Sequence, residues 1–160
     1  MIDKTPSSAE NCLILFSSAL ELLKNINKIM KTLIIDAVSK KIFLVIISNK
    51  NIYTSTYKNS KNNFDKLTLL IDAFLKKNRT SINQIGSLYV NRGPGSFAGI
   101  RTSLSIVKGI HFTKKIDYFS FSYSDFVNED QKKINNWIEV PSLCKKYKIK
   151  KNLINPLYLS

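Results

Sequence analysis

Residues 85–101 read Ile-Gly-Ser-Leu-Tyr-Val-Asn-Arg-Gly-Pro-Gly-Ser-Phe-Ala-Gly-Ile-Arg. The run Ile85–Val90 is mostly apolar and typical of a buried strand. A glycine-rich loop follows, and apolar residues then recur at three- and four-residue steps through Ile100–His111, as they do on one face of a helix. The segment therefore predicts a strand, a tight loop and a helix in direct succession.

The loop itself has three interpretations. Gly93, Gly95 and Gly99 allow close backbone approach, Pro94 stiffens the turn, and Ser96 can cap the helix by accepting a hydrogen bond from a backbone N–H. Exposed N–H groups at a helix start can hold a phosphate, but the spacing matches neither common phosphate-binding motif and no lysine follows in the required place. A plain tight turn and a family-specific contact are the other two interpretations.

Upstream of this segment the sequence predicts three strands, over Lys31–Val38, Ile42–Ile47 and Asn51–Tyr57. The joins between them are only two or three polar residues long, at 39–40 and 48–50. Parallel neighbours need a crossover of a dozen residues or more, so these strands must be antiparallel.

A change of apolar period predicts a helix over Phe64–Lys77, and Ile116–Phe121 is a further predicted strand. The order is then three strands, helix, strand, loop, helix, strand. This order predicts an α/β fold with a mixed sheet and flanking helices. By analogy of fold it is the opening of an actin-like or ribonuclease-H-like lobe of the ASKHA superfamily, although a fold alone assigns no function.

The chain divides into three predicted parts. Residues 1–29 are an N-terminal extension whose apolar stripe suits a helix, and which is either a docking element or a translated upstream segment before Met30. Residues 30–123 form the actin-like lobe. Residues 124–160 are polar and lysine-rich, and we interpret them as a reduced second lobe with one or two short helices, followed by a C-terminal tail.

The composition is strongly basic, with 25 Lys and Arg against 11 Asp and Glu and a net charge of +14. Such a charge favours contact with nucleic acid. The alternative is compositional drift toward Lys, Asn and Ile, which are encoded by AT-rich codons, and the scarcity of arginine supports that alternative.

Two isolated cysteines, Cys12 and Cys144, suit a reducing compartment and offer no metal-ligand spacing. No apolar run approaches the about 20 residues that a bilayer requires, so we expect no membrane association and a cytoplasmic location.

The residues also predict no catalysis, no metal and no cofactor. His111 is the single histidine, which excludes a paired-histidine metal motif within this sequence. Asp36 ends the first predicted strand, where actin-like enzymes place a phosphate- or metal-facing carboxylate, but we favour a structural role for it. No nucleophile and base can be paired from the pattern.

The ten residues 92–101 resemble the signature of the TsaB family, which is also described as Gcp-like or peptidase-M22-like. Residues 33–37 and 155–159 resemble the family's first strand and its closing segment. Ala98 stands where the family usually has Thr, and the second lobe is much shorter than usual. The signature residues are Arg92, Gly93, Pro94, Gly95, Ser96, Phe97, Gly99 and Arg101.

The resemblance implies a non-catalytic partner and heterodimerisation scaffold for TsaD. TsaD transfers threonylcarbamoyl to N6 of adenosine 37 in tRNA. The resemblance further implies a TsaE-like ATPase as an additional partner, tRNA contact only within the complex, and a homodimer as an alternative assembly. It implies an interface on the helices 64–77 and 99–113, with candidate contacts at Leu67, Leu70, Phe74, Ser103 and Leu104. The alternative is that these five side chains face the protein's own core.

Two other functions stay open at this point. One is a small actin-like nucleotide-binding enzyme, which would need a second lobe to close over its ligand. The other is a charge-driven RNA-binding module, although no stacking motif of a known RNA-binding fold is visible.

Overall fold

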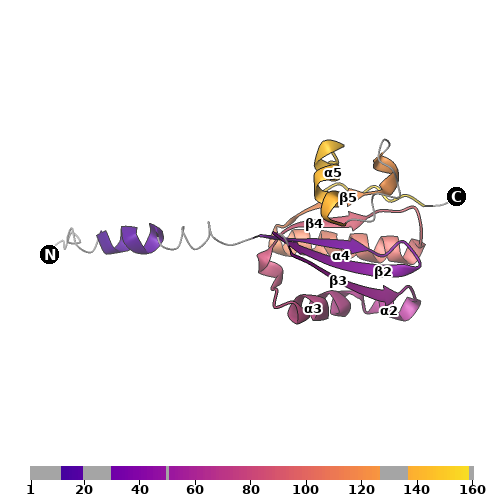
Figure 1. The fold of residues 1–160 in the computed structure, drawn as a ribbon, viewed down its shortest axis with the longest axis horizontal. Helices are drawn as coiled ribbons and strands as arrows, with labels where there is room; N and C mark the ends of the chain where they lie inside the picture. The colour runs from indigo at the N-terminus through magenta and orange to yellow at the C-terminus, as the bar shows by residue number, and fades with distance from the viewer. Residues whose placement is uncertain (1–11, 20–29, 50, 127–136, 159–160) are drawn as a thin grey trace, which may run out of the picture.

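The computed structural model describes residues 12–19, 30–49, 51–126 and 137–158. Within these residues the chain forms one mixed sheet in the order β3-β2-β1-β4-β5, with helices on both faces (Figure 1). The neighbours β1, β2 and β3 are antiparallel, whereas β1, β4 and β5 run parallel. The strands are β1 (Lys31–Asp36), β2 (Lys41–Ser48), β3 (Asn51–Lys58), β4 (Ile85–Asn91) and β5 (Asp117–Phe121).

This sheet confirms the predicted fold class. The short joins produce the two antiparallel hairpins, and the strand limits differ from the prediction by one or two residues. Strand β1 lies at the centre of the sheet, and Leu33 to Asp36 are all buried there. A strand covered on both faces reads as a continuous apolar run, as this one does.

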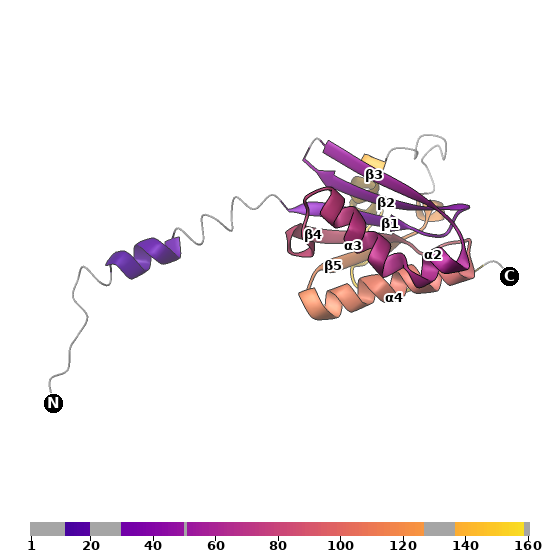
Figure 2. The ribbon, with the colours of Figure 1, turned by 90° about the horizontal axis from the view of Figure 1, so that it is seen from below.

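Helices α2 (Lys61–Asp65), α3 (Leu67–Lys77) and α4 (Phe97–Lys114) cover one face of the sheet (Figure 2). They enclose the larger part of the core, in which the apolar face of α3 meets Leu33, Ile35 and Leu44 of the sheet. Burying this face removes apolar surface from water, which is the main favourable contribution to folding.

The single helix predicted over 64–77 is wrong, because the chain forms two helices that meet at Lys66. Helix α2 begins earlier than predicted, where the side chain of Ser60 accepts a hydrogen bond from Asn63 N. Phe64, before the break, and Leu67, after it, are both buried in the same core. The apolar period therefore runs through the break, and the period alone could not reveal it.

The opposite face of the sheet carries a second core. It is covered by η2 (Tyr123–Asp125), η3 (Trp137–Glu139) and α5 (Val140–Lys146). Val140, Leu143 and Cys144 pack with Phe121 and Phe126 there. Among the described residues after η2, Phe126, Val140, Leu143 and Cys144 are thus buried against the sheet of the first lobe.

The predicted N-terminal extension is described only over residues 12–19, which are helical. Leu13 and Phe16, which belong to the predicted apolar stripe, are 70% and 69% exposed there. The rest of the extension lies outside the described residues, so its two interpretations stay open. Among the helices that the structure describes, none is long and apolar enough to cross a membrane.

Candidate functional site

The glycine-rich loop connects β4 to α4 and lies against the end of β1. Ser96 caps α4, since its Oγ accepts a hydrogen bond from Gly99 N at 3.3 Å. The backbone N–H of Ser96 donates to the carbonyl oxygen of Val38 at 2.8 Å. The capping role predicted for Ser96 is confirmed, and the loop is tied to the turn that joins β1 to β2.

Two glycines of this loop are required by close contacts within the chain. Gly93 has φ +108°, and a Cβ there would lie 2.2 Å from the carbonyl oxygen of Leu157. A Cβ at Gly99 would lie 1.9 Å from the carbonyl oxygen of Ala37. Both distances are far below van der Waals contact, so a side chain cannot fit at either position. The loop glycines therefore pack the chain against itself.

The buried carboxylate of Asp36 connects β1 to the start of the loop. Its Oδ1 accepts from Val38 N at 3.1 Å, and its Oδ2 accepts from Asn91 Nδ2 at 3.0 Å and Tyr123 OH at 3.3 Å. Asn91 Oδ1 in turn accepts from Gly93 N at 3.0 Å. Burial raises the pKa of Asp36, while these hydrogen bonds oppose the rise. Both oxygens are occupied within the protein, in line with the structural role that we favoured.

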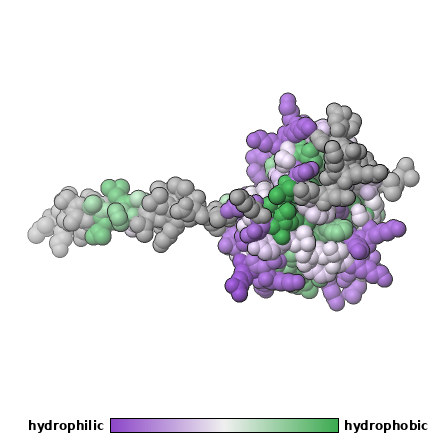
Figure 3. Space-filling model, viewed as in Figure 1, coloured by the Kyte–Doolittle hydropathy of each residue, from purple (hydrophilic) through white to green (hydrophobic). Residues whose placement is uncertain are grey.

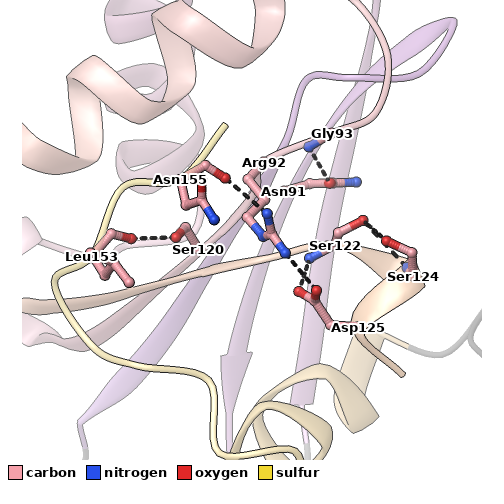
Figure 4. Close-up of polar contacts among 9 residues, drawn as sticks. All are labelled: Asn91, Arg92, Gly93, Ser120, Ser122, Ser124, Asp125, Leu153 and Asn155. Atoms are coloured by element: carbon pink, nitrogen blue, oxygen red, sulfur yellow. Dashed lines mark hydrogen bonds and ion pairs between the residues drawn. The ribbon is translucent and has the colours of Figure 1, made fainter. Parts of the chain in front are cut away.

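Arg92 points into the protein and joins three segments (Figure 4). Its guanidinium donates to the carbonyl oxygen of Asn155 at 2.9 Å and forms an ion pair with Asp125 at 2.5 Å. Asp125 also accepts from Ser122 N at 2.7 Å. The Arg92 and Asp125 side chains are only 13% and 17% exposed. This arginine thus fastens the C-terminal tail and η2 to the end of β4.

Phe97 and Arg101 of the signature behave differently, because their side chains are exposed. Phe97 is 55% exposed, and the guanidinium carbon of Arg101 lies 5.1 Å from the centre of its ring. The ring of Tyr158 also packs against the ring of Phe97, with 4.9 Å between ring centres. Arg101, Phe97 and Tyr158 thus form an exposed stack at the start of α4.

Four of the five predicted interface residues are corrected by the structure. Leu67, Phe74, Ser103 and Leu104 are at most 4% exposed, because they pack in the core between the helices and the sheet. In this arrangement they have no surface for a partner, and the alternative that they face the protein's own core holds. Leu70 is the exception, since it is only partly buried.

A groove between α2 and α3 on one side and α4 on the other is the accessible part of this face. It has a volume of about 450 Å³. The sequence alone did not identify most of its residues, because small polar side chains on a helix surface carry no distinctive pattern. The lining consists of Phe64, Asp65, Thr68, Arg101, Thr102, Ser105 and Ile106.

The described residues also include no group of three or more His, Cys, Asp or Glu side chains arranged to hold a metal ion. His111 lies in the last turn of α4, where its Nδ1 is 2.9 Å from the carbonyl oxygen of Ile116. This contact fits the helix-end position that the sequence indicates for it.

The sheet order and the strand–loop–helix segment define the class of protein as an actin-like or ribonuclease-H-like fold. The solved structure titled YeaZ from Pseudomonas aeruginosa superimposes with a TM-score of 0.55 at 15% identity. The match covers 61% of this chain and 46% of that one. A second solved structure, titled an uncharacterized protein with similarity to peptidase YEAZ from Pseudomonas aeruginosa, gives the same values. Both support the fold.

The sequence comparisons carry the assignment further. The family model described as TsaD, tRNA N6-adenosine threonylcarbamoyltransferase, matches residues 48–122. The tRNA threonylcarbamoyladenosine biosynthesis protein TsaB of Buchnera aphidicola subsp. Baizongia pistaciae is 33% identical over 82 residues. That match covers 51% of this chain and 37% of the relative, so the chain spans little more than a third of the curated protein it matches. The shared region is TsaB-like.

The two glycines of α4 offer a matched test of the loop contact. Replacing Gly99 with Ala should lower the free energy of unfolding by at least about 2 kcal/mol, because the new Cβ overlaps the Ala37 carbonyl. A Cβ at Gly109 would meet no atom within 4 Å, so Gly109→Ala should raise stability by roughly 0.5–1 kcal/mol through helix propensity. Urea unfolding measures both. Equal effects at the two positions would contradict the loop geometry.

The carboxylate of Asp36 can be tested by Asp36→Asn. The amide of Asn91 is oriented by Gly93 N, so it presents its NH₂ group to Asp36. An asparagine at position 36 must direct its own NH₂ toward either Asn91 Nδ2 or Val38 N, which leaves two donors facing each other. We expect a loss of about 1–3 kcal/mol in urea unfolding.

The effect of Asp36→Asn should also depend on pH. Because burial raises the pKa of Asp36 in the folded protein, protonation stabilises the fold, and this contribution is lost as the pH rises through the raised pKa. The wild type should therefore exceed Asp36→Asn in stability by more at pH 4 than at pH 7. Tyr123→Phe, which removes only one donor to the carboxylate, serves as the milder control.

The ion pair of Arg92 can be measured by a double-mutant cycle with Arg92→Met and Asp125→Asn. A pair this well covered should give a coupling energy of about 1–3 kcal/mol in urea unfolding. The exposed pair of Lys151 and Asp117, with side chains 65% and 40% exposed, is the control and should give less than about 1 kcal/mol. If the coupling energy of Arg92 with Asp125 is no larger than that of Lys151 with Asp117, the ion pair of Arg92 does not stabilise the fold as we infer.

Proposed function

We propose that this chain is a non-catalytic accessory subunit in the biosynthesis of N6-threonylcarbamoyladenosine in tRNA, and that it docks on a TsaD-like subunit through α2, α3 and α4. The observation that carries the proposal is the 33% identity to a protein named TsaB, over a stretch of 82 residues. The function entails a cytoplasmic location and tRNA contact within the complex.

The chemistry of the helical face supports docking. Leu69 on α3 and Phe112 on α4 are 67% and 62% exposed, so each helix presents a large apolar side chain that a partner can cover. Arg101 at the groove provides a guanidinium for a partner carboxylate. The described residues thus offer exposed apolar side chains beside a groove that is lined mostly by polar ones.

The docking surface that we propose differs from the one expected from the sequence. Leu70 is only partly buried, but it lies on the opposite side of α3 from Thr68, so it does not line the groove. A helix of the partner laid between α3 and α4 would contact Thr68, Ser105 and Ile106 first. A second copy of this chain would use the same surface, and so would compete with a TsaD-like subunit. A TsaE-like ATPase would join the assembled pair.

The proposal predicts that Ser105→Arg abolishes capture of this chain by an affinity-tagged TsaD-like subunit from the same organism. Ser105 is exposed and lines the groove, so an arginine side chain fills the groove without disturbing the core. Thr54→Arg adds the same charge on the exposed strand β3, away from the groove, and should leave capture unchanged. Pull-down from co-expressing cells measures both.

Modification of tRNA completes the test. The pair should form threonylcarbamoyladenosine on a tRNA transcript in the presence of the adenylate donor, and Ser105→Arg should reduce that activity at least tenfold, on the order of the 1.4 kcal/mol that one tenfold step represents. Full activity of the TsaD-like subunit without this chain, or equal capture of both variants, would refute the proposal.

A further inference from the structure

We propose that residues 145–151 form a binding surface for the phosphate backbone of RNA on the face opposite the docking helices. The sequence there reads Lys-Lys-Tyr-Lys-Ile-Lys-Lys, so five of the seven residues are lysine. The whole chain has 25 Lys and Arg in 160 residues. Compositional drift raises lysine throughout the chain, but it does not concentrate lysine in one short segment.

The fold directs these lysines outward. Tyr147 and Ile149 turn toward the second core, where Tyr147 packs on Phe126 with 5.6 Å between ring centres. Lys145, Lys148 and Lys150 are exposed between or beside them. The alternation of inward apolar and outward basic side chains gives one continuous basic edge, and hydrophilic residues are visible over α5 at the upper end of the domain (Figure 3).

The segment is also held at both ends. At its start, Ile149 N donates to the carbonyl oxygen of Cys144 at 2.9 Å, which closes α5 and places Lys148 at φ +53°. At its end, the side chain of Asn152 accepts from Tyr118 N at 3.0 Å and donates to Asp117 at 2.7 Å. Because the backbone is fixed, less conformational entropy is lost when a ligand orders the lysine side chains.

Two carboxylates near this segment are paired within the chain. Asp117 pairs with Lys151 at 3.0 Å, and Asp125 pairs with Arg92 at 2.5 Å. Lys148 and Lys150 line a small hollow of about 160 Å³ that contains this second pair. Lys145, Lys148 and Lys150 are exposed beside these pairs, and a polyanion meets no unpaired carboxylate among the residues that line the hollow.

The partner that fits this edge is a phosphate backbone. A membrane surface would need apolar side chains beside the lysines to insert into the lipid, whereas Tyr147 and Ile149 point inward. The edge begins at the end of α5 and continues past it, and α5 and the helices α2 to α4 cover opposite faces of the sheet (Figure 1). A TsaD-like subunit on α3 and α4 would leave it free. The choice of tRNA as the RNA rests on the proposed function, but the phosphate contact does not.

The test compares two charge-matched variants of the full chain. Lys145→Gln, Lys148→Gln and Lys150→Gln together lower the net charge from +14 to +11. The control replaces Lys61, Lys66 and Lys77, all exposed on α2, α3 and their junction, with Gln and makes the same change in net charge. Fluorescence anisotropy with a labelled tRNA transcript, measured over a series of salt concentrations, gives the affinity and its salt dependence.

The first variant should bind tRNA at least about tenfold more weakly, and the slope of log K against log salt should fall by roughly two to three units, because each lost phosphate contact contributes about 0.7–0.9. The control should stay within about twofold of the wild type. Equal losses of affinity in both variants would show that only net charge matters, and would overturn the proposal. Wild-type protein that binds phosphatidylglycerol vesicles but not tRNA would also overturn it. Capture of the first variant by the TsaD-like subunit separates this outcome from the docking proposal, since that capture should be unchanged.

Discussion

The contact between the end of β1 and the loop after β4 is the constraint on which the rest of the structure depends. The carbonyl oxygens of Ala37 and Val38 lie where side chains at Gly99 and Gly95 would have to be. The same strand end places Asp36 against Asn91, which orients the first peptide of the loop. Helix α4 therefore begins where the sheet permits it, and its position sets the groove beside α2 and α3.

Arg92 extends this constraint to the other face of the sheet. Through Asp125 it holds η2, and through Asn155 it holds the C-terminal tail, whose Leu157 N–H also donates to the Arg92 carbonyl at 2.8 Å. An arginine suits this position because its planar guanidinium can donate to two acceptors in different directions at once. Arg92, Gly93 and Gly99 of the signature thus assemble the fold, while Pro94, Phe97 and Arg101 are exposed.

The sequence predicted local features well and distant contacts poorly. Short joins between strands settle their antiparallel pairing, and Ser96 before a helical pattern settles its cap, because both signals lie within a few residues. The break at Lys66 escaped detection since the apolar period continues across it. The pair of Arg92 and Asp125 joins residues 33 positions apart, and an arginine in a loop gives no sign of which carboxylate it will meet.

The failure at the helical face has a specific physical cause. The period of an amphipathic helix identifies the side that is buried, and it cannot tell whether a sheet or a partner covers that side. Leu67, Phe74 and Leu104 belong to that stripe, and they are buried in the core against the sheet. Residues available to a partner must come from the flanks of the stripe, where Thr68, Ser105 and Ile106 lie, and a flank is defined only once the neighbouring helix is in place. A partner surface on two packed helices therefore depends on how the helices are arranged in space. Here that arrangement is set by Gly95 and Gly99, which let the start of α4 approach the end of β1.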